Sequence, residues 1–337
     1  MRSRCVLALA RLLCALYATA GSPSARAAEA DANVYDEACK ESRRPSPLTP
    51  LPVGHRLDSA KVALGRELFH DTRLSRDRSI SCASCHDIDA GGDDGQVRSR
   101  GIEGREGSIN APSVLNRGFD FRLFWDGRAA SLSEQVDGPL QARNEMSSSW
   151  DTVLPRLADD REFADRFIHS YASGLTAANV RDAIATFERS LITPGAPLDR
   201  FLCGDDAALA PAARRGYELF LDYGCVSCHQ GRNAGGNMFQ RFGILGDYFA
   251  DRGDVTSADL GRFNQTGHES DRYVFKVPSL RNVEYTAPYF HDGSAATLEA
   301  AIDVMGRYQL GRALSPRDVA DLAAFLRALS APVWRGP

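Results

Sequence analysis

The chain has 337 residues, of which 43% are hydrophobic and 25% charged, and its formal net charge is −4 with neutral histidines. This length suggests two domains. The acidic balance argues against a nucleic-acid-binding protein, whose affinity depends on neutralising phosphates with basic side chains. After the N-terminal segment, no stretch approaches the ~20 consecutive apolar residues that a membrane helix needs, so we expect no membrane span.

Residues 1–27 are typical of a secretory signal peptide. Arg2 and Arg4 supply a basic start, residues 12–20 form an apolar run, and the Ala-Arg-Ala of residues 25–27 matches a cleavage site. A disordered tail is the alternative. Without the four arginines of this segment, 36 basic residues face 44 acidic ones, which gives the mature chain a formal charge of −8. The sequence therefore predicts an exported protein with a moderately acidic surface.

Two of the eight cysteines, Cys5 and Cys14, lie in the predicted signal peptide, and four more belong to the motifs described next. Cys39 and Cys203 remain. In an oxidising compartment they can form a disulfide that ties the N-terminal arm to the domain linker. They can also stay as free or intermolecular thiols, because sequence spacing does not establish that two cysteines are close in space.

The chain contains two copies of Cys-x-x-Cys-His, at residues 82–86 and 225–229. This is the attachment motif of c-type haem, in which two thiols bond the haem edge and the histidine takes the iron from one side. Zinc sites and redox dithiols also use Cys-x-x-Cys, but neither needs the added histidine. We therefore predict two c-type haems, held by the thiols and imidazoles of Cys82, Cys85, His86, Cys225, Cys228 and His229.

The sequences around the two motifs form a repeat. A Gly-x-Glu-Leu-Phe segment precedes each motif, at residues 65–69 and 216–220, and reads as the end of a helix. Pro-Ser segments at 112–116 and 278–282 are followed by Asp-Gly turns, and apolar helices at 180–191 and 319–329 close the units. Their expected core faces are Ile184, Phe187 and Leu191, and Leu322, Phe325 and Leu329.

We therefore predict a mainly α protein with two tandem cytochrome c-type haem domains and long loops. Residues 28–195 form the first domain with an N-terminal arm, and residues 196–337 form the second. Between them, residues 193–197 (Thr-Pro-Gly-Ala-Pro) break the preceding helix and form the linker.

The two copies differ after their Asp-Gly turns, where the second axial position of a haem is decided. The second copy has Met305, whose thioether can ligate iron and raise its potential, although core packing is the commoner fate of a methionine. The first copy has Gln135 and Glu145 instead. A carboxyl beside an open iron can move protons between the oxygens of a bound peroxide, whereas most glutamates are simply solvated. Met146 is an alternative ligand that would close the first haem.

From about residue 64 to residue 329 the chain resembles the bacterial dihaem cytochrome c peroxidases. The resemblance rests on segments at residues 110–112 (Asn-Ala-Pro), 124–129 (Phe-Trp-Asp-Gly-Arg-Ala), 138–139, 145–146, 191–194, 287–291 (Ala-Pro-Tyr-Phe-His) and 304–306 (Val-Met-Gly). It implies reduction of hydrogen peroxide to water with electrons from a small cytochrome c or a blue copper protein. It also implies a periplasmic location, and a homodimer is possible.

The resemblance assigns a role to each matching position. His86 would ligate the peroxidatic haem, with Glu145 as its acid–base residue and Gln135 beside it. His229 and Met305 would ligate the electron-transfer haem, and Trp125 would lie between the haems to pass electrons. Phe124 and His291 would lie near a haem. One calcium ion would sit between the domains, on Asn110 and the carbonyls of Thr286 and Pro288, since calcium prefers oxygen ligands.

The chain departs from the family at Ile102. Many relatives have a histidine at this position that caps the peroxidatic iron at rest, and isoleucine has no ligand atom. We therefore expect the peroxidatic haem to be open at rest. Ile102 lies in a loop, residues 91–107, whose content of glycine and charged residues predicts that it is mobile. A substitute ligand such as His70 or His268 is the alternative.

Two rival functions stay open. One is a dihaem oxidase of a protein or organic substrate, such as the enzyme that matures tryptophan tryptophylquinone. Those enzymes have tyrosine where this chain has Met305, which argues against them, but the missing cap is compatible with them. The other rival is a non-enzymatic dihaem electron carrier, which requires two ligands on both irons.

Overall fold

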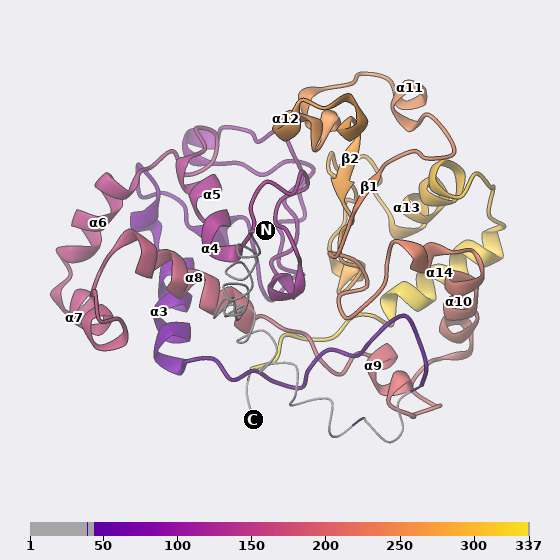
Figure 1. Ribbon diagram of the computed structural model, residues 1–337, viewed down its shortest axis with the longest axis horizontal. Coiled ribbons are helices and arrows are strands. Elements are labelled where there is room, and N and C mark those ends of the chain that lie inside the picture. Colours follow the sequence, from indigo (N-terminus) through magenta and orange to yellow (C-terminus); the bar gives the residue numbers. More distant parts are fainter. Residues whose placement is uncertain (1–38, 40–43, 336–337) are drawn as a thin grey trace, which may run out of the picture.

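The computed structural model describes Cys39 and residues 44–335 (Figure 1). The predicted signal peptide lies outside these residues. The described chain folds into two helical units that lie side by side, with an extended linker between them. No helix in this part of the chain is both long and apolar enough to cross a bilayer.

The first unit contains the helices before the linker: α3 (Ser59–Phe69), α4 (Leu132–Gln135), α5 (Asp137–Gln141), α6 (Trp150–Ala158), α7 (Arg161–Ser170) and α8 (Ala177–Ser190). The second unit contains α9 (Pro197–Leu202), α10 (Pro211–Asp222), α11 (Tyr248–Arg252), α12 (Phe263–Thr266), α13 (Leu298–Val304) and α14 (Pro316–Arg327). One antiparallel pair, β1 (Phe239–Arg241) and β2 (Val274–Lys276), has Phe239 opposite Lys276. The mainly α architecture with two tandem units is as predicted.

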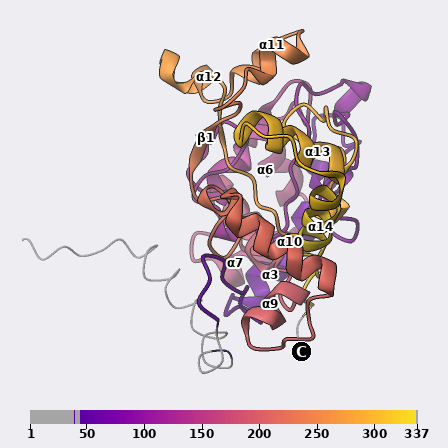
Figure 2. The same cartoon turned by 90° about the vertical axis from the view of Figure 1, so that its right-hand side faces the viewer.

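Each unit is built on one close helix crossing, α3 with α8 and α10 with α14; Figure 2 shows the second pair side by side. Glycine permits both crossings. A Cβ on Gly65 would lie 1.9 Å from the carbonyl oxygen of Ala183, and a Cβ on Gly216 would lie 1.9 Å from that of Asp321. The first residue of each Gly-x-Glu-Leu-Phe segment is therefore needed where two backbones touch.

The two closing helices begin at side-chain caps. The Thr176 hydroxyl accepts the N–H of Asn179 at the start of α8, and the Ser315 hydroxyl accepts that of Asp318 at the start of α14. The apolar faces that the sequence predicted for these helices are all buried, in the cores formed around Ile184, Phe187, Leu191, Leu322, Phe325 and Leu329.

The chain ends cross over between the units. Near the N-terminus, Leu48 pairs with Gly231, directly after the second haem motif, before the chain enters α3 of the first unit. Near the C-terminus, the N–H of Trp334 donates to the carbonyl of Ile192 in the linker at 2.8 Å. The N-terminal arm, which leads into the first unit, thus contacts the second unit, and the C-terminal arm, which leaves the second unit, contacts the end of the first.

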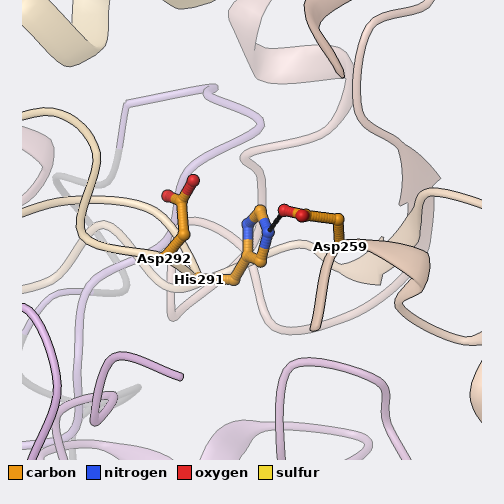
Figure 3. A group of neighbouring side chains, drawn as sticks. All are labelled: Asp259, His291 and Asp292. Carbon is orange, nitrogen blue, oxygen red and sulfur yellow. Dashed lines mark hydrogen bonds and ion pairs between the residues drawn. The ribbon is translucent and has the colours of Figure 1, made fainter. Parts of the chain in front are cut away.

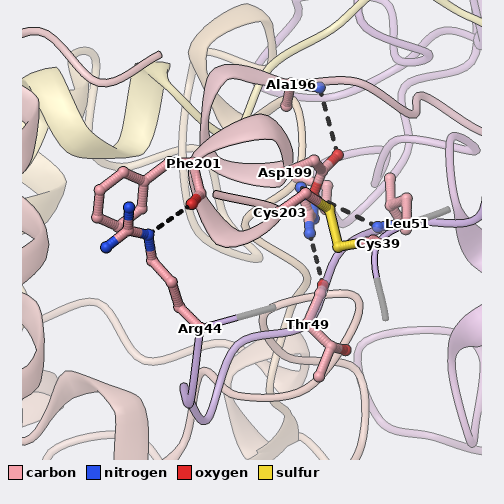
Figure 4. Close-up of a disulfide and its surroundings, with 9 residues drawn as sticks. Cys39, Arg44, Thr49, Leu51, Ala196, Asp199, Phe201 and Cys203 are labelled. Carbon is pink, nitrogen blue, oxygen red and sulfur yellow. Dashed lines mark hydrogen bonds and ion pairs between the residues drawn. A yellow bond between two sulfur atoms is a disulfide. The ribbon is translucent and has the colours of Figure 1, made fainter. Parts of the chain in front are cut away.

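The N-terminal arm is also joined to α9 by a disulfide between Cys39 and Cys203 (Figure 4). Of the two alternatives left open by the sequence, the structure has the bridge. Beside it, Asp199 and Arg281 form an ion pair of 2.7 Å with both side chains fully buried. Asp199 also accepts the N–H of Leu51, so the arm, α9 and the second unit share one buried polar contact.

The linker is held by its first residue. The Thr193 hydroxyl accepts a hydrogen bond of 2.9 Å from the Asn116 side-chain amide and donates one of 2.8 Å to the side-chain carbonyl of Asn282. Asn116 and Asn282 are the last residues of the two Pro-Ser segments, and both have left-handed backbones, with φ of 62° and 60°. One buried threonine therefore connects equivalent points of the two units.

Candidate haem sites and the contact between them

Each haem motif forms a short 3-10 turn, η2 (Cys82–Ser84) and η5 (Cys225–Ser227). The turn η5 closely follows α10, whereas a loop with the short turn η1 (Thr72–Leu74) separates η2 from α3. The four motif cysteines are unpaired, and burial raises the pKa of the Cys82 thiol to about 12. Within the described residues, only Asp259, His291 and Asp292 form a metal-binding-type group of three or more. A single four-cysteine zinc site is therefore not formed.

The two motif histidines are oriented in the same way. His86 donates from Nδ1 to the carbonyl of Gly92 at 3.0 Å, and His229 donates to that of Ala234 at 3.3 Å. Burial lowers the pKa of both imidazoles, that of His229 to about 4, so both are neutral at ordinary pH. With Nδ1 as the donor, Nε2 keeps its lone pair, which is the state needed to ligate iron.

A serine holds the carbonyl-bearing loop in each unit. Ser113 donates to the carbonyl of Gly91, next to the acceptor for His86, at 2.6 Å. Ser279 donates to the carbonyl of Asn233, next to the acceptor for His229, at 2.8 Å. The sequence revealed the Pro-Ser repeat but not this purpose, because the loop residues of the two copies differ.

Polar atoms near the first motif suit a haem. Ser99 lies close enough to Cys85 to act on its thiol, and the Ser99 hydroxyl is buried without a hydrogen-bond partner among the described residues. The Nε of its neighbour Arg98 is buried without a hydrogen-bond partner. The Arg98 guanidinium also pairs with Glu106 at 3.7 Å, but the buried Nε is left over, and such a donor is suited to an acidic propionate, since buried donors are otherwise satisfied. The residues present therefore fit the two c-type haems predicted from the motifs.

Glu145 lies in the first site, close enough for its charge to act on Cys85. Burial first, then the negative charges of Asp94 and Glu145, raise the pKa of the Cys85 thiol to about 11. Burial likewise raises the pKa of the Glu145 carboxyl, and the positive charge of Arg128 opposes that rise. Arg128 also lies 3.5 Å over the Phe124 ring. Arg128 belongs to the segment at residues 124–129 that resembles the family, but sequence reasoning assigned it no role.

The loop that carries Ile102 is packed against Glu145. Ile102 is fully buried, and its N–H donates to the carbonyl of Glu145 at 3.0 Å. A Cβ on Gly101 would lie 2.2 Å from the carbonyl oxygen of Asn144. We predicted a mobile loop from its composition. The structure instead has an apolar side chain and a close backbone contact at its centre.

The other two candidates of the first site differ in placement. Met146 is buried in the helical core with Leu140 and Val153, which is the packing role that competes with iron ligation. Gln135 is partly exposed at the end of α4. No hydrogen bond joins its side chain to Glu145 in the part of the chain that the structure describes.

Met305 begins a π-helical turn, Met305–Gln309, directly after α13. Such turns are rare and often occur at functional sites. Its side chain packs against four buried aromatic residues, Phe242, Tyr248, Phe249 and Phe275, which we call the aromatic cluster. The Asp-Gly turn before α13 has the same geometry as its counterpart in the first unit, with a positive φ at Phe124 and Phe290.

Trp125, from the first unit, packs against the same aromatic cluster as Met305. Its indole N–H donates to the carbonyl of Asn110 at 3.0 Å, and its own carbonyl accepts the N–H of Lys276 in β2 at 2.8 Å. Trp125 is therefore fixed at the contact between the units.

The residues assigned to calcium lie at this same contact. Asn110 is buried, its side-chain N–H donates to the carbonyl of Gln96, and its backbone N–H donates to the carbonyl of His291. Thr286 and Pro288 lie in the adjoining segment, around a cis peptide bond between Ala287 and Pro288. The amide oxygen of Asn110 faces no side-chain donor of the described residues.

Sequence reasoning missed Asp259. It is buried and accepts a 2.7 Å hydrogen bond from Nε2 of His291. Burial opposes ionisation of Asp259, but hydrogen bonds from His291 and Arg252 outweigh it and hold the pKa of this carboxyl below its ordinary value. An acid in a variable, charged loop carried no signal that would have paired it with a histidine 32 residues later.

Comparison with known proteins now decides the family. A family model described as di-haem cytochrome c peroxidase matches residues 59–207, and one described as cytochrome c matches residues 213–330. The chain is 41% identical to cytochrome c551 peroxidase of Nitrosomonas europaea, over 84% of this chain and 84% of that protein. The chain belongs to the di-haem cytochrome c peroxidase family. It is therefore an enzyme of the peroxidase class, built around two c-type haems.

Two further similarities bear on this family assignment. The chain is 46% identical to cytochrome c peroxidase Ccp of Escherichia coli over 85% of its own length, and it spans 62% of that protein. The crystal structure of a MauG-like protein associated with microbial copper homeostasis superposes with a TM-score of 0.72 at 29% identity, covering 85% of this chain and 93% of that one. The dihaem peroxidase family thus includes MauG-like members of the same fold.

Proposed function

We propose that the protein is a periplasmic dihaem peroxidase that reduces hydrogen peroxide to water with electrons from a small redox protein, a cytochrome c or a blue copper protein. The observation that carries this proposal is the asymmetry of the two sites. The first has a partly buried carboxyl, Glu145, beside its haem motif, and the second has the thioether of Met305. When bound, the haem iron of the first site supplies the redox chemistry that cleaves the oxygen–oxygen bond.

Glu145 does the proton work in this proposal. Its carboxylate takes the proton from one peroxide oxygen and returns it to the other, which leaves as water. Two further protons and two electrons convert the remaining oxygen to a second water. Partial burial suits this role, because it raises the pKa of the Glu145 carboxyl, and the positive charge of Arg128 opposes that rise. Gln135 is assigned here to binding the oxidant.

The peroxidatic site is open at rest in this proposal. In this proposal Ile102 stands at the position of the capping histidine and contributes only an apolar side chain, which is fully buried, while its backbone N–H donates to the carbonyl of Glu145. The burial of Met146 in the helical core supports the same conclusion, because this side chain is engaged in packing. Reductive activation is then unnecessary.

His229 and Met305 would hold the second haem and His86 the first, and these haems would supply the electron transfer, with Trp125 between them to pass electrons. Support comes from the packing of Met305 and Trp125 on the aromatic cluster.

The proposal keeps the predicted domain limits, residues 28–195 for the first domain and residues 196–337 for the second. The predicted signal peptide, the c-type haems and the disulfide fit an oxidising periplasm. One calcium ion, on Asn110, Thr286 and Pro288, is part of the proposal.

One rival has a specific observation in its favour, since MauG-like proteins share the fold. Such a protein would oxidise a protein or organic substrate. Met305 favours the peroxidase instead, because the rival enzymes resemble this family but place tyrosine there. A plain electron carrier would need a second side-chain ligand in the first site.

The test is peroxide turnover by the holoprotein as isolated and fully oxidised, with a reduced small cytochrome as donor and no prior reduction of the enzyme. We expect turnover from the first mixing, without a lag. A lag that disappears after prereduction would overturn the open resting site, and absence of turnover under both conditions would overturn the peroxidase assignment.

A further inference from the structure

A buried polar network lies in the second unit beside Trp125. Arg252 binds both oxygens of Asp259 at 2.8 Å and also contacts Asp292 at 2.5 Å. Figure 3 shows His291 between the two acids, with its hydrogen bond directed to Asp259. Asp259 also accepts from the backbone N–H and the hydroxyl of Thr256. Both oxygens of Asp259 are therefore fully used.

This saturation argues against a metal ion at Asp259, His291 and Asp292, although their ligand atoms lie within 4.8 Å of one another. The Arg252 guanidinium already bridges the two carboxylates and offsets part of their charge. A cation would have to displace it and break the hydrogen bond of His291. The network therefore looks like a device that fixes the His291 ring.

The His291 ring is held on several sides. Phe275 lies on it with ring centroids 4.5 Å apart, and Phe249 lies at 6.0 Å. The edge of the ring meets Trp125, with centroids 6.3 Å apart and planes at 71°. Only 2% of His291 is exposed. Its orientation is thus set by Asp259 at one end and by aromatic packing at the other.

His291 also reaches Trp125 through the backbone. Its carbonyl accepts the N–H of Asn110 at 2.8 Å, and the carbonyl of Asn110 accepts the indole N–H of Trp125 at 3.0 Å. The ring and the main chain of one residue therefore both constrain the same indole. The connection crosses from the second unit, which holds Asp259 and His291, to the first unit, which holds Trp125.

We propose that Asp259 and His291 are positioning residues for Trp125, and that they set the rate at which electrons pass between the two units. The proposal rests on the proposed function, in which Trp125 is the bridge. An indole that rotates in its pocket changes its contacts with both sides, and small displacements of reacting partners cost large factors in rate. Asp259 fixes the orientation of the His291 ring through its hydrogen bond, and His291 restricts rotation of the Trp125 indole through its ring contact.

The test uses Asp259→Asn and His291→Phe in the holoprotein. The first keeps the shape of Asp259 but weakens its grip on the imidazole, and the second keeps a flat ring but removes the bond to Asp259. Asp292→Asn is the matched control, since Asp292 shares Arg252 but is not bonded to His291. His291→Phe leaves the Asp259–Arg252 pair intact, so it carries the test if Asp259→Asn does not fold.

The primary readout is the stopped-flow rate of oxidation of the second haem after a protein with only that haem reduced is mixed with peroxide. We expect a fall of about tenfold or more in both variants, an altered ultraviolet resonance Raman band of the indole, and unchanged reduction potentials of both haems. Peroxide consumption by the first site should be unchanged, and Asp292→Asn should behave as the parent. Normal transfer rates in both variants would overturn the proposal.

Trp125→Phe separates this inference from the function beneath it. If Trp125→Phe slows transfer and the two variants do not, the positioning proposal fails and the bridge stands. If Trp125→Phe has no effect, the bridge fails and the positioning proposal fails with it. If the parent consumes no peroxide, the peroxidase assignment itself is wrong.

Discussion

The backbone carbonyl of Glu145 accepts a 3.0 Å hydrogen bond from the N–H of Ile102. This bond joins the residue proposed for proton transfer to the residue that we expect at the position of the family's capping histidine. Because Ile102 is fully buried, the loop is held by an apolar anchor rather than by a side chain on the iron. Fixing the loop and leaving the iron open are therefore compatible in this chain.

The first prediction concerns the acid–base role of Glu145. Glu145→Gln keeps the size of the side chain but removes its ability to accept a proton, so we expect peroxide reduction to slow by about 10²–10⁴-fold. The absorption spectra of both haems should not change. Glu162→Gln, an exposed acid in α7, is the control and should retain full activity. Unchanged turnover in Glu145→Gln would remove this residue from the mechanism.

The second prediction separates the two methionines, Met305 and Met146, that the sequence offers as haem ligands. Met305→Leu should convert the second haem to a high-spin spectrum and lower its reduction potential, because a thioether ligand raises that potential. Met146→Leu should keep both spectra, since Met146 packs among apolar residues. Met238→Leu is the control for a partly exposed methionine. A spectral change in Met146→Leu would instead favour the electron carrier.

The third prediction concerns the helix crossing in the first unit. Gly65→Ala places a methyl group 1.9 Å from the carbonyl oxygen of Ala183, so α3 and α8 must separate. We expect a loss of at least about 2 kcal/mol in the free energy of unfolding, as for overpacked cores. Gly118→Ala meets its nearest atom at an ordinary 3.5 Å and should cost much less in the same thermal melt. Equal melting temperatures for the two variants would contradict the crossing.

The fourth prediction concerns pH. Burial raises the pKa of the Glu188 carboxyl from 4.5 to about 8. The folded state therefore holds a proton that the unfolded chain releases, so this group stabilises the fold fully below about pH 4.5 and its contribution is lost as pH rises towards 8. We expect the unfolding free energy to fall by up to about 1.4 kcal/mol per pH unit in that window. In Glu188→Gln that part of the slope should vanish, and an identical slope would show that Glu188 ionises normally.

Local sequence patterns predicted the parts of the fold that repeat. The glycines of the two crossings, the apolar faces of α8 and α14, and the break at residues 193–197 were visible because each is set by nearby residues. The contacts of the terminal arms were not predictable. These contacts join residues far apart in the chain, Leu48 with Gly231 and Trp334 with Ile192, and no periodic pattern in the sequence predicts such pairs. Proximity of Cys39 and Cys203 had the same limit.

The candidate sites divide in the same way. The haem-attachment residues follow from a short motif whose chemistry fixes its spacing. The serine contacts of Ser113 and Ser279 and the Asp259–His291 pair depend on how loops fold over one another, and long loops leave many alternatives open. The loop around Ile102 was predicted to be mobile because glycine and charge dominate its composition, and one buried isoleucine outweighs that average.

Low-temperature electron paramagnetic resonance of the oxidised, as-isolated protein tests the asymmetry of the two haems most directly. The account predicts two ferric signals of equal weight, a low-spin signal from the haem with His229 and Met305 and a high-spin signal from the haem with His86. Two low-spin signals in the oxidised protein, with the signal of the His86 haem staying low-spin after the second haem is reduced, would mean that both irons carry two side-chain ligands, and the proposed peroxidase mechanism would be wrong.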